Sequence, residues 1–261
     1  MIIDFHTHFY PENIADRAME RGRTFGVEPV SDGTLAGLLK EMDRCGIDHA
    51  VGLPLANKPD NVRGVNNWAY NLKNDRITML GSIHPLTPDP ATHIKWLAEH
   101  GFRGIKMHPE YQQFRFDDPT LEPIWQSLID NKMFLLTHAG VDIGFPPPYH
   151  SDPASLAAFH RGHPELMLVL AHLGSWNMWD EVKKHLVGLP LYMDCCFVGN
   201  LLPDAEFMEI VRKHGVERIL FGSDSPWRKQ DGDVEFINRL PLTEQEKELI
   251  FYRNARKLLG I

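Results

Sequence analysis

Eight short apolar runs recur along the whole chain, and the segments between them are long enough to hold a helix. The runs begin near Ile2, His49, Ile77, Phe102, Met133, Met167, Pro190 and Arg218. Each spans roughly 4–8 residues, which is typical of parallel strands that are buried on both faces. After the first connection the spacing is roughly 23–35 residues, enough for one helix and two loops. The pattern therefore predicts strands that alternate with helices.

The intervening segments carry helical signals. "TLAGLLKEMDRCG" (residues 34–46) and "DPATHIKWLAEHG" (89–101) space their apolar residues along one helical face and end on glycine. Similar patterns occupy residues 118–131, 204–215 and 243–260. The last of these opens with a capping box formed by Thr243 and Glu246. The long first connection, residues 9 to about 47, is expected to hold extra loop structure.

Eight strand–helix units in 261 residues predict an α/β fold, a (β/α)8 TIM barrel formed by residues 1–261 as a single domain. In such a barrel the active site lies at the carboxyl ends of the strands. The competing fold is a doubly wound open sheet, which would place a glycine-rich loop after the first strand. The stretch "HTHFYPEN" that follows the first run contains no glycine. No linker or repeat divides the chain.

The composition excludes several classes of partner. A net charge of −8 and a pI near 5.9 disfavour nucleic acid, which binds basic surfaces. No apolar run approaches the roughly 20 residues that cross a bilayer, and the N-terminus lacks the features of a signal peptide. The three cysteines are Cys45, Cys195 and Cys196, and the adjacent pair cannot form an ordinary disulfide. We therefore expect a reduced, cytoplasmic protein with no membrane partner.

Unusual polar residues gather at the ends of the predicted strands. They are His6, His8, His84, Lys106, His108, His138, His172 and Asp224. Residues at i and i+2 of a strand share a face, so His6 and His8 are expected to point together. A single histidine at a strand end is more often structural than catalytic, but so many polar groups at buried strand ends would be costly without a shared purpose. A divalent cation such as Zn²⁺, bound by imidazole and carboxylate groups, supplies that purpose.

Five motifs in order, "DFHTH", "GIKMHP", "THAG", "AHLG" and "FGSDSPW", resemble the amidohydrolase superfamily. More narrowly, the chain resembles the amidohydrolase-2 branch, which includes aminocarboxymuconate-semialdehyde decarboxylase and benzoate-type decarboxylases. The resemblance runs from the first strand to the eighth. It implies a metal-dependent (β/α)8 barrel, in agreement with the strand count.

The resemblance also implies roles for individual residues. His6, His8, His138 and Asp224 correspond to the metal ligands, and Asp224 also handles a proton as a catalytic residue. His172 corresponds to a catalytic histidine beside the metal, which becomes a ligand in two-metal relatives. Lys106 lies where those relatives carry a carbamylated lysine. One ion is favoured over two, and Zn²⁺ is the expected metal.

Substrate contacts are predicted for Lys106, His108 and Trp227, which are expected near the rim and suit an anionic or aromatic molecule. Trp227 follows Asp224 by only three residues. The proline-rich stretch "GFPPPYH" (144–150) fits either a lid or an oligomer contact. Dimers are common among soluble proteins, so a homodimer is the expected assembly.

Three functions remain open. The favoured one is a metal-dependent hydrolase that opens an amide, ester or lactone of a small molecule with a metal-activated water. The alternative is a nonoxidative decarboxylase of an aromatic or enol carboxylic acid. The third is a catalytically silent barrel that acts as a binding protein, which the intact set of five candidate metal-site residues disfavours.

Overall fold

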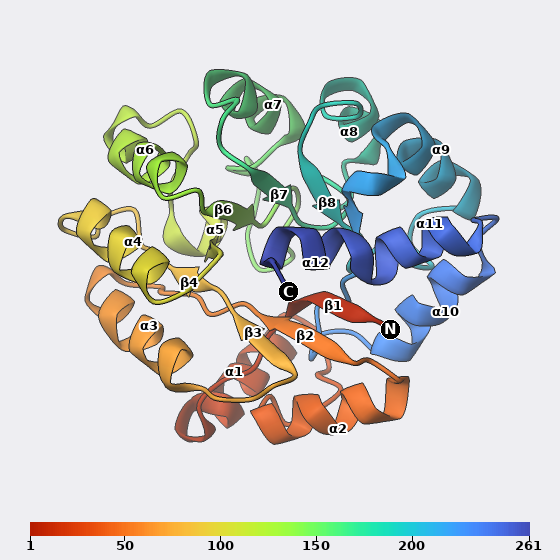
Figure 1. The fold of residues 1–261 in the computed structure, drawn as a ribbon, viewed down its shortest axis with the longest axis horizontal. Helices are drawn as coiled ribbons and strands as arrows, with labels where there is room; N and C mark the ends of the chain where they lie inside the picture. The colour runs from red at the N-terminus through yellow and green to blue at the C-terminus, as the bar shows by residue number, and fades with distance from the viewer. The chain divides into compact units, whose positions relative to one another are not determined.

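The computed structural model describes residues 1–261, and short strands alternate with helices throughout the chain (Figure 1). The strands are β1 (Ile3–Thr7), β2 (His49–Gly52), β3 (Ile77–Met79), β4 (Gly81–Ser82), β5 (Gly104–Met107), β6 (Phe134–Thr137), β7 (Leu168–Leu170), β8 (Tyr192–Asp194) and β9 (Ile219–Leu220). The α-helices are α1 (Glu12–Thr24), α2 (Leu35–Cys45), α3 (Val62–Asn71), α4 (Pro90–Glu99), α5 (Pro109–Gln112), α6 (Glu122–Asp130), α7 (Pro153–Gly162), α8 (Trp179–His185), α9 (Asp204–His214), α10 (Gln230–Arg239), α11 (Glu244–Glu248) and α12 (Asn254–Leu259).

All eight predicted strands are present, and the third is broken into β3 and β4 at Leu80. The expectation of loop structure in the first connection was incomplete, because α1 occupies much of it ahead of α2. The buried side of α1 is formed by small and flexible residues, Ala15, Met19 and Gly22, which give a weak apolar signal. A Cβ on Gly22 would lie 2.2 Å from the ring of Trp227, so only glycine allows this approach.

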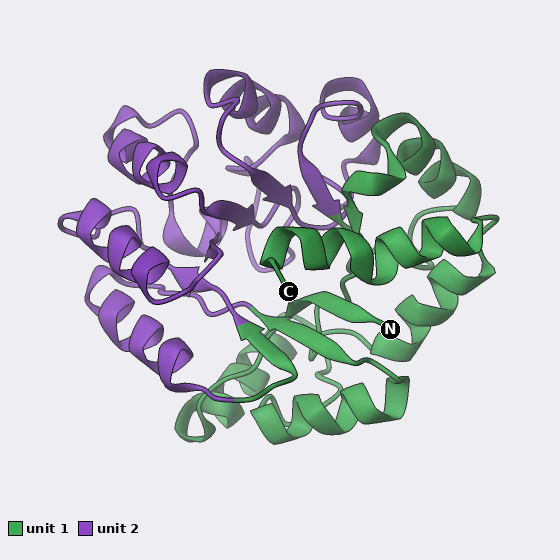
Figure 2. Ribbon diagram, viewed as in Figure 1, with its two compact units in different colours: residues 1–52, 74–78, 194–261 green, residues 53–73, 79–193 purple.

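The chain divides into two compact units, each built from separate stretches of sequence (Figure 2). Unit 1 comprises Met1–Gly52, Asn74–Thr78 and Asp194–Ile261, and unit 2 comprises Leu53–Lys73 and Met79–Met193. In unit 2 the strands from β4 to β7 and the first two residues of β8 are neighbours in sequence order, and each pair is parallel. Their side chains are almost entirely buried, and the helices of this unit lie along the outer side of its strands (Figures 1 and 2).

In unit 1, β1 pairs in parallel with β2 on one side. On its other side, the Phe5 amide donates to the carbonyl of Phe221, directly after β9. Every residue of β1 is buried, as expected for an interior strand. These pairings bring the N-terminal strand beside a segment more than two hundred residues later in the chain.

Local signals set the helix boundaries. The side chains of Asp89 and Asp152 accept hydrogen bonds from the first turns of α4 and α7, and proline follows each of them. The capping box of Thr243 and Glu246 is confirmed at the start of α11. Helix α2 ends at Gly46, whose φ of 68° favours glycine.

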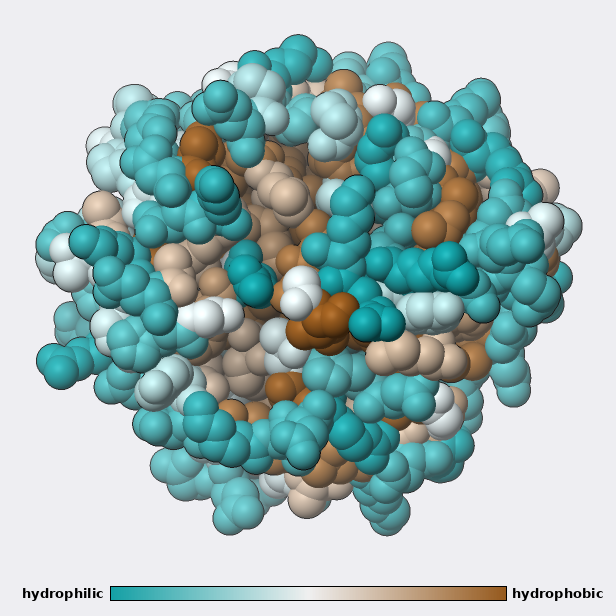
Figure 3. All heavy atoms as spheres, in the orientation of Figure 1, coloured by the Kyte–Doolittle hydropathy of each residue, from teal (hydrophilic) through white to brown (hydrophobic).

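The face drawn in Figure 3 is mostly hydrophilic, with apolar atoms in scattered groups. Large apolar side chains that are exposed, such as Leu86 and Ile143, are few among the many that are buried. None of the helices combines the length and the hydrophobicity needed to span a bilayer.

Candidate metal centre

Three of the predicted ligands converge within unit 1. The Nε2 atoms of His6 and His8 lie 3.6 Å and 3.1 Å from the same carboxylate oxygen of Asp224, Oδ1. The two imidazole rings are 5.2 Å apart. His6 is buried, whereas His8 and Asp224 are partly accessible. Two imidazole nitrogens and one carboxylate oxygen facing one point form an arrangement that suits a divalent cation.

Backbone contacts hold this cluster together. The Asp224 amide donates to the carbonyl of His6, and the His8 amide donates to the carbonyl of Ser225. Thr7, between the two histidines, directs its hydroxyl to the carbonyl of Val51 on β2. Asp224 has a φ of 66°, a left-handed conformation that is uncommon outside glycine and frequent at functional sites.

A buried carboxylate, Asp4, joins the two segments that carry the cluster. It accepts hydrogen bonds from the amides of His6 and Ser223 and from the side chain of Gln230. Burial raises the pKa of Asp4 to about 6, and these hydrogen bonds oppose the rise. Asp4 thereby fixes the backbone on both sides of the cluster.

A second buried carboxylate, Asp194 at the end of β8, contacts the other face of His6. Its Oδ2 lies 2.8 Å from Nδ1 of His6, and the thiol of Cys196 lies 3.3 Å from the same nitrogen. The sequence predictions assigned no role to this strand. The only signal was an aspartate at the end of an apolar run, "PLYMDCC".

In unit 2, His138 and His172 face each other after β6 and β7. Nδ1 of His138 lies 3.1 Å from Nε2 of His172, and Nε2 of His138 is buried without a hydrogen-bond partner. Burial, together with His108 and His172 beside it, holds the pKa of His138 well below its usual value. His138 is therefore neutral near pH 7, which is the form that binds metals.

His108 and Lys106 also lie in unit 2. The ring of His108 stacks on that of His138, with centroids 4.2 Å apart, and its Nε2 lies 3.2 Å from Asp142. Nδ1 of His108 accepts from the amide of Tyr111 and so caps α5. Lys106 lies within β5 and is 1% exposed. Trp227, the remaining predicted substrate contact, belongs to unit 1 and packs its ring against Gly22 of α1.

The loop between β6 and α7 contains partners that the sequence predictions missed. Asp142 contacts His108, and His150 contacts the buried carboxylate of Glu110 through both its ring and its backbone amide. The ring of Phe145 lies 5.0 Å from that of Tyr111. The loop is thus attached to the segment that follows β5 at Asp142 and, within the proline-rich stretch 144–150, at Phe145 and His150.

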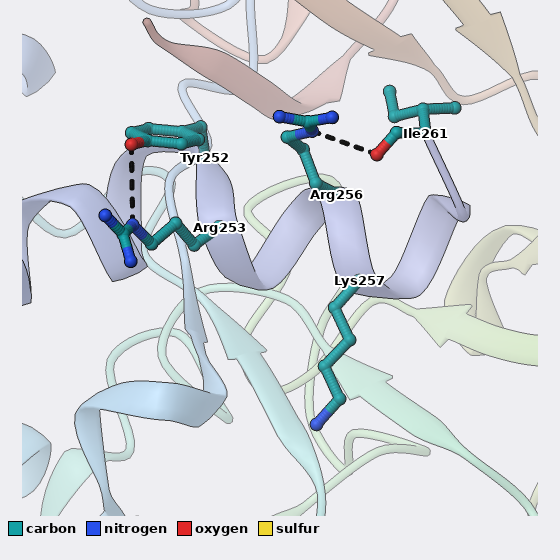
Figure 4. Close-up of a pocket in the computed structure, with 5 residues that line it drawn as sticks. All are labelled: Tyr252, Arg253, Arg256, Lys257 and Ile261. Carbon is teal, nitrogen blue, oxygen red and sulfur yellow. Dashed lines mark hydrogen bonds between the residues drawn. The ribbon is translucent and has the colours of Figure 1, made fainter.

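A surface pocket of about 480 Å³ lies in unit 1 and is shown in Figure 4. It is lined by Tyr252, Arg253, Arg256, Lys257 and Ile261. Nε of Arg256 donates to the carbonyl of Ile261. The lining offers no imidazole or acidic side chain, and none of the predicted site residues contributes to it.

The residues of both units suit a divalent metal. His6, His8 and Asp224 present their donor atoms within 4.8 Å of one another. In unit 2, the unpartnered Nε2 of His138 is a buried polar atom that a further ligand would satisfy. Neutral imidazole with carboxylate is a donor set used by Zn²⁺ and by related first-row metals.

The family model described as Amidohydrolase matches residues 3–261, and the chain therefore belongs to the amidohydrolase-2 family. The resemblance found in the motifs is confirmed. No curated protein matches the chain in sequence.

Solved structures confirm the predicted fold class. An uncharacterized TIM-barrel protein, Bb4693 of Bordetella bronchiseptica, is 21% identical, with a TM-score of 0.75 over 99% of this chain and 98% of that one. A 5-carboxyvanillate decarboxylase of Novosphingobium aromaticivorans, complexed with manganese and a nitrobenzoic acid, is 16% identical, with a TM-score of 0.74 over 100% and 96%. A 2,6-dihydroxybenzoate decarboxylase complexed with 2,6-dihydroxybenzoate is 17% identical, with a TM-score of 0.70 over 100% and 99%. At these identities the likeness establishes the α/β TIM-barrel fold alone.

Proposed function

We propose that this chain is a metal-dependent decarboxylase that releases CO₂ from a small carboxylated aromatic molecule. The observation that carries the proposal is the convergence of His6 and His8 on Asp224, in a family whose compared structures include decarboxylases. The sequence favoured hydrolysis. The named activities among those structures favour the alternative, decarboxylation.

The proposed ligands are His6, His8 and Asp224 of unit 1, with His138 of the "THAG" motif as the fourth, and one ion per chain. The donor set suits Zn²⁺, and the manganese of the carboxyvanillate enzyme makes Mn²⁺ the second metal to test. A divalent cation bound there would supply a Lewis acid that binds the oxygens of the substrate. Lys106, His108 and Trp227 remain the proposed substrate contacts.

The proton chemistry falls to Asp224 and His172. Either group can hold a proton, at a carboxylate oxygen or an imidazole nitrogen, and deliver it to the ring carbon that bears the carboxylate. A C–H bond then forms at that carbon. The C–C bond to the carboxylate breaks, its electron pair restores the aromatic ring, and CO₂ leaves.

The test uses protein stripped of metal and reloaded with Zn²⁺ or Mn²⁺. We expect metal-dependent release of CO₂ from 5-carboxyvanillate or 2,6-dihydroxybenzoate. Asp224→Asn and His172→Asn should each lower the rate by about 10²–10⁴-fold, because each removes a proton-transfer group. His93→Ala on α4 is a control, and it should retain both metal and activity.

Two other outcomes would contradict the proposal. Metal-dependent hydrolysis of amides or lactones without CO₂ release would support the hydrolase. The absence of both activities and of stoichiometric metal would support a binding protein.

A further inference from the structure

Asp194 has no role in the predicted site, yet its carboxylate directly contacts the ring of His6, a proposed ligand. Its carboxylate is fully buried, and Oδ2 lies 2.8 Å from Nδ1 of His6. Both residues belong to unit 1, although 188 positions separate them in sequence. A fully buried carboxylate is costly unless its hydrogen bonds are satisfied.

The contact with Asp194 decides which nitrogen of His6 is available. A neutral imidazole carries one proton, on either Nδ1 or Nε2. A carboxylate only accepts hydrogen bonds, so Asp194 selects the tautomer with the proton on Nδ1. The lone pair is then on Nε2, which is the atom that faces Asp224 at 3.6 Å.

The surroundings keep Asp194 in this orientation. Its other oxygen, Oδ1, accepts from the amide of Cys196, and the amide of Cys195 donates to the carbonyl of Leu220 on β9. A Cβ on Gly222 would lie 3.0 Å from that of His6 and 3.5 Å from that of Asp194. The missing side chain at Gly222 therefore allows the two residues to pack closely.

We propose that Asp194 is a positioning residue that holds His6 in the tautomer whose Nε2 can bind a divalent cation. The inference rests on the proposed metal site. It adds a carboxylate–histidine pair, Asp194 with His6, and thereby gives strand β8 a role in the site. Partners of this kind typically change metal affinity by about 10–100-fold.

Asp194→Asn provides a sharp test because it preserves shape and reverses one hydrogen bond. The Cys196 amide can only donate, so the carbonyl oxygen of the new side chain should take the place of Oδ1. Its NH₂ group then faces Nδ1 of His6 and donates to it. His6 is forced to carry its proton on Nε2, and that nitrogen can no longer bind the metal.

The experiment measures two quantities in the full-length protein. The affinity for Mn²⁺ and Zn²⁺ is measured by competition with a chromophoric chelator. The tautomer of His6 is read in the metal-free protein from the ¹⁵N chemical shifts of labelled histidine, and His6→Gln assigns the signal. We expect Asp194→Asn to weaken binding about 10–100-fold and to move the His6 proton to Nε2.

Two variants serve as controls. Cys196→Ala removes the thiol near the same nitrogen, and Asp233→Asn neutralises a buried aspartate that instead pairs with Arg228. Both should keep the His6 tautomer and bind metal within about threefold of the wild type. A change of tautomer in Cys196→Ala would assign the role to the thiol and overturn the proposal.

The wild type alone keeps the proposal falsifiable if Asp194→Asn fails to fold, because a proton on Nε2 of wild-type His6 would refute it. Unchanged affinity and tautomer in a folded Asp194→Asn protein would also refute it. Failure of the metal site is a separate result. It would appear as undiminished metal binding in His6→Ala, whatever the tautomer of His6.

Discussion

Buried histidines in this protein differ in the groups that surround them. His6 has a carboxylate at Nδ1, whereas the surroundings of His138 combine two imidazoles with the charges of Asp142 and Lys106. His160 on α7 is buried with no hydrogen-bond partner for Nδ1. The surroundings of His6 therefore hold its imidazole in one tautomer, whereas burial simply keeps the imidazole of His160 neutral.

His160 predicts part of the acid sensitivity of the fold. Burial, with Arg161 beside it, lowers the pKa of His160 below its ordinary value of 6.5. The unfolded chain therefore takes up a proton first as the pH falls through 6.5, and the folded state loses stability below that pH. His160→Leu should lose less unfolding free energy between pH 7.5 and pH 5.5 than the wild type, as measured by urea denaturation. An equal loss of unfolding free energy in the variant and the wild type would contradict this prediction.

For individual residues, the sequence reveals those whose type is rare at the end of a buried strand. His6, His8 and Asp224 could be named because each lies near the end of a predicted strand, and the structure brings the three together. Asp194 and Glu110 could not be named, because their importance comes from partners far along the chain. No local pattern records that Asp194 lies against His6.

The loop between β6 and α7 shows how single contacts organise an element. Its first part is fixed by Gly140, whose φ is 89° and where a Cβ would lie 2.4 Å from the amide nitrogen of Trp176. Its later part is held by the contact of His150 with Glu110. These contacts hold residues 144–150 against the segment that follows β5, and the lid and the oligomer contact both stay predictions for this stretch.

Glu110→Gln should release this loop. Glu110 is buried and bonds to His150, so the change should cost about 1.5–3 kcal/mol of unfolding free energy, the range for hydrogen bonds to charged groups. Hydrogen exchange should accelerate in residues 141–151.

Glu122→Gln is the matched control, because Glu122 makes a similar contact with His163 but is exposed. It should cost less than about 1 kcal/mol and leave the exchange of the loop unchanged. Equal effects of the two changes would contradict a holding role for Glu110.

Helices with a strong periodic pattern of apolar residues were predicted well. Elements with a weak pattern were missed. Helices α2, α4 and α9 carry apolar stripes and clear boundaries, and they lie where the sequence placed them. Helix α1 was missed because its buried face includes Gly22, where a larger side chain would meet Trp227. The break between β3 and β4 has no distinct sequence signal.

Across the whole molecule, metal binding and folding should be coupled. Any ligand that binds only the folded state stabilises it, by about 2.7 kcal/mol when its concentration is 100 times Kd. Mn²⁺ or Zn²⁺ should therefore raise the unfolding free energy of the wild type by about this amount. His6→Ala should show no rise at the same concentration, and an equal rise would place the metal elsewhere.

The fold class was the most predictable property, because it depends on repetition along the whole chain. The eight apolar runs at regular spacing predict the same fold class even when one strand boundary is placed wrongly, as at the break after β3. The catalysed reaction is less predictable, because hydrolases and decarboxylases of one family can share a ligand set. Their difference lies in substrate contacts, which the pattern of strands does not encode.

The pairing of β1 has a consequence for synthesis on the ribosome. Asp4 and Ser223 are separated by 219 positions, so at about 5–20 residues per second β1 waits roughly 10–40 s for this partner. During that time β2 can cover only one side of the strand. The other side is an open edge of unpaired backbone N–H and C=O groups, which can pair with neighbouring nascent chains. We therefore expect this edge of β1 to stay unpaired in newly made chains until the segment around Ser223 has been synthesised.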